Sequence, residues 1–199
     1  MKRSCMCGRV LGACALFAAG LTAGLLLPRG PEAAGQAAAR AQPAKVLAEE
    51  WLRQQKLDLP EPPKSKHTLV RAVRVGDLLF VSGHGPTKED GMPWTGQLGK
   101  DLDIKQGQAA ARRVGLHVLR VVRDELGSLN KVARLVKALG MVNATADFKD
   151  HPAVVDGFSD LMVEVFGEKA GKGARSAVGM SSLPGGIAVE VEAIFEVKR

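Results

Sequence analysis

The carboxyl-terminal segment from residue 187 to 198 constrains the fold most, because its side chains alternate strictly between two sets. A period of two is typical of a strand that buries one face. The buried set is expected to be Ile187, Val189, Val191, Ala193, Phe195 and Val197. Just upstream, Pro184 cannot donate to a strand ladder and the glycines at 185 and 186 accept turn dihedrals. We therefore expect residues 173–180 and 187–198 to form two strands joined by a tight turn.

This hairpin is expected to place Arg175 near Glu190, with Glu192 on the same face of the sheet. Two interpretations of these charges are open. A glutamate at every second strand position is usually a solvated face, and an arginine opposite it a surface ion pair of little energetic worth. The periodicity alone favours that interpretation. The other is that the arginine and the glutamates belong to a site on the polar face, which solvent or a partner subunit would cover.

Composition indicates one ordinary domain and argues against a nucleic-acid-binding surface. The chain has 199 residues, 46% of them hydrophobic, and a net charge of +7. Five basic residues and one acidic residue precede position 43, which leaves 23 basic against 20 acidic residues in the body. Aromatic residues make up 4% and tyrosine is absent, so bases would find few rings to stack on. All three cysteines lie within the first 14 residues, so the body holds no thiol for catalysis or metal binding.

The amino-terminal segment 1–28 has the layout of an export signal. Lys2, Arg3 and Arg9 precede an apolar run from Val10 to Leu27, and small residues follow it. The run approaches the length that spans a bilayer, so a cleaved signal peptide and an uncleaved signal-anchor are both open. The alanine-, glycine- and proline-rich stretch 29–43 is predicted to be a linker. We expect the folded part to be exported, either periplasmic or elsewhere outside the cytoplasm, with membrane attachment only through an uncleaved anchor.

The rest of the chain predicts an α+β domain of two layers. Residues 44–63 form a short helix and a proline-rich lead-in to a domain at 64–199. Two apolar runs flank Gly76-Asp77 and predict a hairpin. Helical spacing predicts helices from 104 to 126 and from Pro152 to Gly167, and the β-branched run 132–142 predicts a strand, with a helix as the alternative. Two helices are expected on one face of a mainly antiparallel sheet.

Three motifs in this order, RVGDLLFVSGHGP, GARSAVGM and LPGGIAVEVEAIFEV, resemble the Rid family of reactive-intermediate imine deaminases, also called YjgF. The phrases LPEPPK, GMVNATADF and SDLMVEVFG resemble the branch labelled endoribonuclease L-PSP-like. The resemblance covers about residues 64 to 199. It implies a chorismate-mutase-like fold and a homotrimer whose sheets close into a barrel. Small-molecule carboxylate ligands would bind in the clefts between subunits.

The resemblance also assigns site residues. It implies that Arg175 clamps the substrate carboxylate and that Glu190 positions the hydrolytic water, these two being the catalytic pair. Substrate-binding positions carried over are Ser82, Gly83, Asp156 and Ala177. The implied reaction hydrolyses a 2-imino or enamino acid to the 2-keto acid and ammonia, without a metal or an organic cofactor. Planar two-pronged binding of a carboxylate suits a guanidinium, which lysine cannot copy.

The chain departs from the family pattern at three places. Leu69 stands where many members have a tyrosine, Ala177 replaces a cysteine, and Asp156 replaces an asparagine. A non-catalytic trimer that binds a small carboxylate or a protein partner in the same cleft is therefore the alternative function. Ribonuclease activity is disfavoured by the near-neutral body and the few aromatics. His84 is expected to be a loop histidine without a catalytic role, and the alternative is that it faces the cleft as an acid or base. His117, inside a helix, is expected to be structural.

Overall fold

The computed structural model describes residues 47–62, 68–87 and 94–199. The predicted export segment 1–28 and the linker 29–43 lie outside the described residues. No helix in the described part is long and apolar enough to cross a bilayer. In chain order the helices and strands are α1 (Ala48–Gln54), β1 (Ala72–Val75), β2 (Leu78–His84), α2 (Ile104–Leu126), η2 (Leu129–Lys131), β3 (Val132–Asn143), α3 (His151–Phe166), α4 (Glu168–Gly171), β4 (Ala174–Met180), η3 (Pro184–Gly186) and β5 (Val189–Val197).

Local sequence signals account for several of these boundaries. The predicted helix 104–126 is confirmed as α2, which begins at a capping box between Asp103 and Gln106 and ends at Gly127, where φ is 77°. The hairpin β1–β2 is also confirmed. Val75 pairs with Leu78 across two residues, the first of which is Gly76 with φ of 60°. The strand predicted over residues 132–142 is confirmed as β3, so the helical alternative is wrong.

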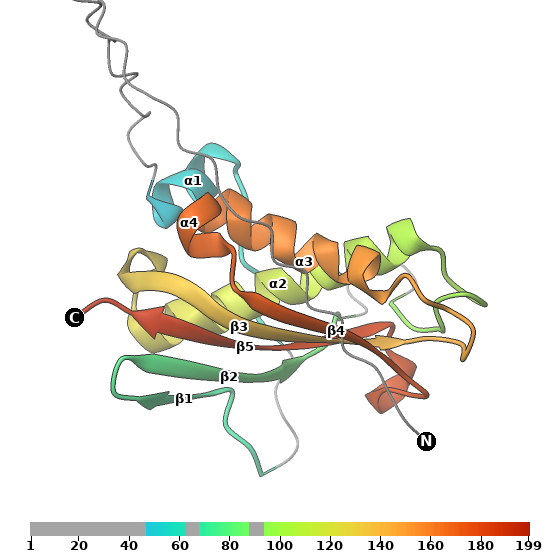
Figure 1. The fold of residues 1–199 in the computed structure, drawn as a ribbon. Coiled ribbons are helices and arrows are strands. Elements are labelled where there is room, and N and C mark those ends of the chain that lie inside the picture. The colour runs from blue at the N-terminus through green and yellow to red at the C-terminus, as the bar shows by residue number, and fades with distance from the viewer. Residues whose placement is uncertain (1–46, 63–67, 88–93) are drawn as a thin grey trace, which may run out of the picture. The chain divides into compact units, whose positions relative to one another are not determined.

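The described strands form one five-stranded sheet in the order β1-β2-β5-β3-β4, as Figure 1 shows. Pairing is antiparallel except between β3 and β4, which are parallel. The predicted carboxyl-terminal hairpin is wrong, because β3 lies between β4 and β5. A parallel pair needs a crossover connection, and α3 with α4 supplies it between β3 and β4. The last strand then enters the middle of the sheet, between β2 and β3.

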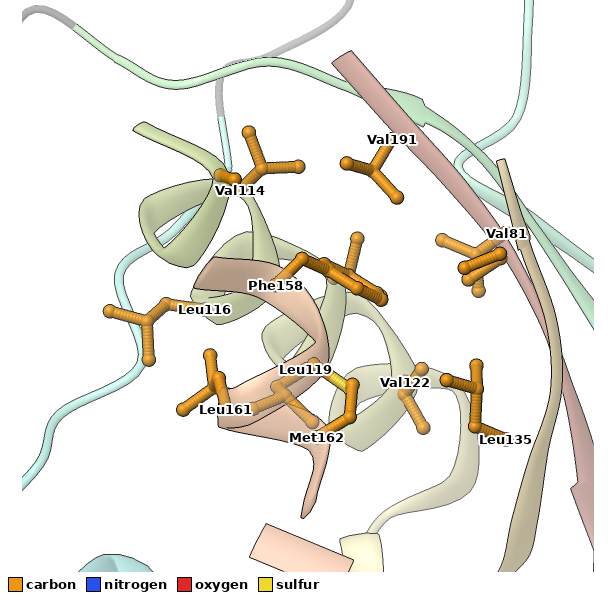
Figure 2. Close-up of a cluster of buried hydrophobic side chains, with 14 of the residues drawn as sticks. Val81, Val114, Leu116, Leu119, Val122, Leu135, Phe158, Leu161, Met162 and Val191 are labelled. Atoms are coloured by element: carbon orange, nitrogen blue, oxygen red, sulfur yellow. The ribbon is translucent and has the colours of Figure 1, made fainter. Parts of the chain in front are cut away.

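Both long helices pack on one face of the sheet, as predicted (Figure 1). The alternating strand β5 turns its apolar set toward them. Figure 2 shows the core between the layers, where Phe158, Leu161 and Met162 of α3 lie among residues of α2 and the sheet. These three side chains are fully buried. The short helix α1 contacts α3, and its Trp51 packs partly buried against the core.

The opposite face of the sheet, here called the open face, carries exposed apolar side chains that no helix of the described residues covers. Its exposed apolar side chains are 36% to 61% accessible and come from three strands. They are Val73, Val75, Leu78, Phe80, Val178 and Met180. Exposed apolar patches of this kind are typical of interaction surfaces.

Candidate functional site

Arg175 lies on the edge strand β4 and points toward α3. Its strand partner is the buried Ala138 of β3, which faces the helices. The Nη1 atom of Arg175 donates to Oδ1 of Asp156 at 2.6 Å and to Oγ of Ser159 at 3.0 Å. Positions 156 and 159 project from the same side of α3 because they are three residues apart on a helix. The arginine is therefore fixed by two acceptors from the helix above it.

The rest of the guanidinium has no acceptor among the described residues, since only Nη1 takes part in the hydrogen bonds of Arg175. The side chain of Arg175 is 25% exposed and that of Asp156 is 47% exposed. Ala177, two residues further along β4, lies on the same side of the strand and packs partly buried against the core. These residues, Arg175, Ala177, Asp156 and Ser159, form the arginine cluster.

Glu190 lies on the open face of β5, beside the end of β2. A bulge interrupts the pairing of β2 with β5 between Val81 and His84. Gly83 lies in this bulge, and a β-carbon there would overlap the Glu190 carboxylate. Any other residue at position 83 would therefore have to displace the Glu190 carboxylate from this position. Glu190, Ser82 and Gly83 form the glutamate cluster.

The surroundings of Glu190 favour the protonated form of its carboxyl more than bulk water does. Burial raises the pKa of Glu190 above its ordinary value, and the charge of Glu192 raises it further. The Ser82 hydroxyl donates to the carbonyl of Val70 at 2.8 Å, which ties the bulge to the segment before β1. A hollow of about 580 Å³ opens there, lined by Thr68, Leu69, Val70 and Ser82. Leu69, the position of the family tyrosine, thus lies beside the glutamate cluster.

The two clusters do not meet in one chain, which corrects the prediction that Arg175 and Glu190 are neighbours on one polar face. Arg175 faces the helices from the sheet edge, whereas Glu190 faces the other way two strands inward. The prediction failed because it assumed that β4 pairs with β5. With β3 inserted between them, the alternation of each strand says nothing about the relative faces of the two.

Two polar residues near the clusters were not predicted. Ser159 shares the arginine with Asp156, and its spacing of three residues from Asp156 on a predicted helix was the available signal. Lys137 lies on the open face, where its Nζ donates to Oγ of Ser176 at 2.8 Å. Together with Phe80 and Glu192 it lines a shallow hollow of about 240 Å³. No local pattern pointed to this lysine.

His84 and His117 point into the core rather than toward Glu190, and His84 lies in β2 rather than in a loop. His84 pairs with Val191 at the end of β2, and its Nδ1 lies 2.6 Å from the carbonyl oxygen of Ser82. Burial lowers its pKa below the ordinary histidine value. His117 in α2 is fully buried, with Nδ1 at 3.0 Å from the carbonyl oxygen of Gly85. The described residues contain no cluster of three or more histidine, cysteine or carboxylate side chains suited to a metal.

Comparison with known proteins gives this fold a family. Residues 49–186 match the family model described as "YjgF/chorismate mutase-like, putative endoribonuclease". The chain belongs to the Rid/YjgF family. The matched region contains the whole arginine cluster and Gly83, while Glu190 follows it in β5.

Relatives of this Rid/YjgF protein span bacteria, archaea and protozoa. It is 42% identical to Protein TCP17 of Trypanosoma cruzi over 71% of this chain and 88% of the relative. A RutC family protein of Pyrococcus abyssi is 30% identical over 74% and 97% of the two chains. Among solved structures, Atu1372 of Agrobacterium tumefaciens, of unknown function, has a TM-score of 0.68 at 34% identity, covering 77% of this chain and 93% of its own. A "putative endoribonuclease" of Shewanella oneidensis has a TM-score of 0.71 at 28% identity, covering 76% and 99%.

Proposed function

We propose that this Rid/YjgF protein is an exported deaminase that hydrolyses 2-imino or enamino acids to 2-keto acids and ammonia. The observation that carries the proposal is the anchored guanidinium of Arg175. Its Nη1 is held by α3, while Nη2 and Nε have no acceptor among the described residues. A guanidinium held in this way presents two parallel donors to a ligand carboxylate at the open edge of the sheet.

The reaction requires that substrate and water be oriented and that one group transfer a proton. Water adds across the C=N bond of the imine, and the resulting carbinolamine expels ammonia as the carbonyl forms. Because the imine carbon is already electrophilic, holding the substrate and the water in place supplies much of the acceleration. Glu190 is the general base in this scheme, since its raised pKa lies closer to neutral pH than that of an ordinary glutamate.

The site is complete only between copies of the chain, because the two clusters face opposite sides of one sheet. Two features of the single chain support self-association, and the family resemblance makes a homotrimer the assembly that we propose. The edge strand β4 has a strand partner on one side only among the described residues, and Arg175 is its single charged residue. Unprotected edges of this kind invite pairing. The apolar open face would be buried where the sheets of neighbouring copies meet.

Placing a charge on the open face is expected to dissociate the assembly. Phe80 is 41% exposed in the single chain, so Phe80→Glu leaves the fold intact but buries a carboxylate in the interface. Sedimentation equilibrium should give three chain masses for the wild type and one for Phe80→Glu. Leu47→Glu, at an exposed position in front of α1, is the matched control and should remain trimeric. A wild type that is monomeric at micromolar concentration would remove the intersubunit site.

The deaminase activity is tested by following keto acid formation from 2-imino acids that an amino-acid oxidase generates in place. Glu190→Gln is expected to lower kcat by about 100-fold, with KM little changed, because the general base is lost. A raised folded-state pKa means that ionised Glu190 opposes folding as pH rises, so this variant should also melt at a higher temperature at neutral pH. Glu196→Gln, at a partly exposed carboxylate on the same strand, is the control and should keep the wild-type kcat. If the wild type forms keto acid no faster than buffer does for several substrates, the enzyme hypothesis is wrong.

The export component rests on the basic and apolar segment 1–28. Mass spectrometry of the chain recovered from an extracytoplasmic fraction should show a shortened amino terminus, or the full chain in the membrane fraction. A full-length chain confined to the cytoplasm would contradict export.

A second function, binding without turnover, is favoured by one specific observation. Asp156 already accepts a hydrogen bond from Arg175, the residue that would clamp a substrate carboxylate. Leu69 lacks the hydroxyl of the family tyrosine. A non-catalytic trimer would bind a 2-keto acid or a protein partner in the same cleft. Calorimetric binding of a 2-keto acid together with an absence of imine hydrolysis would establish this alternative.

A further inference from the structure

We propose that Asp156 makes the site select 2-imino acids that carry a second, cationic nitrogen over simple aliphatic ones. This inference deepens the proposed function and rests on it. The starting point is that the arginine does not present an isolated positive charge. Its Nη1 lies 2.6 Å from Oδ1 of Asp156, so the pair is formally neutral.

Each member of the pair keeps unused bonding capacity and is partly exposed. Of the Asp156 carboxylate, only Oδ1 takes part in a bond within the described chain, and the side chain is 47% exposed. Of the Arg175 guanidinium, only Nη1 is engaged there. The structure therefore presents adjacent donors and a carboxylate oxygen, which together match a ligand that carries both an anionic and a cationic group.

Coulomb interactions set the direction of selection. A substrate carboxylate bound to Nη2 and Nε lies within a few ångströms of the Asp156 carboxylate, and the repulsion offsets part of the attraction to the arginine. A cationic substituent that reaches Asp156 is attracted to it, so Asp156 then stabilises the bound substrate instead of repelling it. A neutral aliphatic side chain gains nothing from Asp156, because it offers no donor to the Oδ2 atom that Arg175 leaves unbonded.

A purely structural role for Asp156 predicts a different outcome. If the carboxylate served only to hold Arg175 in place, its loss would lower kcat/KM for every substrate by the same factor. Ser159 accepts from the same Nη1 at 3.0 Å and would keep the arginine anchored in Asp156→Asn. The ratio of rates between two substrates therefore separates selection from positioning.

The experiment compares kcat/KM for the imino acids derived from arginine and from leucine, using the wild type, Asp156→Asn and Asp160→Asn. The wild type should prefer the arginine-derived imine about tenfold or more, and Asp156→Asn should shift the ratio toward leucine by about tenfold. Asp160→Asn removes an exposed carboxylate one turn along α3 that is not bonded to Arg175, and should leave the ratio within about twofold. An unchanged ratio in Asp156→Asn, or equal losses for both substrates, would overturn the proposal.

A binding measurement keeps this test separate from the proposed activity. If the wild type hydrolyses neither imine, the deaminase proposal fails, and calorimetry with the 2-keto acids of arginine and leucine decides the role of Asp156. Tighter binding of the cationic keto acid that is lost in Asp156→Asn supports selection. Equal affinities in the wild type, or no binding of either, overturn it.

Discussion

Arg175→Lys is expected to lower kcat/KM for 2-imino acids by about 100-fold or more, although the charge is retained. The guanidinium of Arg175 performs two tasks at once, since Nη1 is held by α3 while its other nitrogens remain for a carboxylate. A lysine ammonium is a single point charge that cannot bridge both partners with planar geometry. In Arg175→Lys we expect the amine to pair with Asp156, which leaves the ligand without a donor.

The control for this substitution is Arg112→Lys. Arg112 forms a two-pronged ion pair with Glu164 of α3, at 2.9 and 2.7 Å, on the exposed surface. Surface pairs contribute little to stability, so this variant should keep both its rate and its fold. Steady-state kinetics with both variants, and circular dichroism to verify folding, complete the test. An Arg175→Lys rate within threefold of the wild type would show that the arginine does not clamp the substrate.

Phe158→Ala is expected to lower the free energy of unfolding by about 3–5 kcal/mol, the range typical for truncating a fully buried phenylalanine. Phe158 has no exposed surface and fills the space between α2, α3 and the sheet (Figure 2). Its ring lies against Gly115 of α2, where an added β-carbon would come within 3.3 Å of it. The surrounding backbone cannot collapse into the vacated volume without moving α3.

The consequence reaches the arginine cluster, because Asp156 and Ser159 flank Phe158 on α3. Denaturant unfolding at a fixed chain concentration measures the loss, since dissociation of subunits would otherwise contribute. Val163→Ala, at a half-buried position on the same helix, should cost less than about 1.5 kcal/mol. A loss below about 1 kcal/mol for Phe158→Ala would mean that the helical layer repacks freely.

The sequence predicted the elements well where the signal was local. Helix α2 begins and ends at the predicted residues because a capping box and a left-handed glycine mark its ends. The hairpin β1–β2 was predictable from Gly76 between two apolar runs. Arg175 and Asp156 were both named as site residues, and the structure shows their ion pair. Their contact depends on the packing of β4 under α3, and no local sequence pattern predicts that packing.

For the alternating segment 187–198, the sequence and the tertiary structure determine different properties. By itself the sequence determined that this segment is a strand with one buried face, because a period of two follows from the geometry of an extended backbone. Only the tertiary structure decided that β5 lies between β2 and β3, and so that Arg175 and Glu190 face opposite sides. Strand order depends on contacts between residues far apart in the chain, and the crossover through α3 made β4 a parallel edge strand rather than the partner of β5.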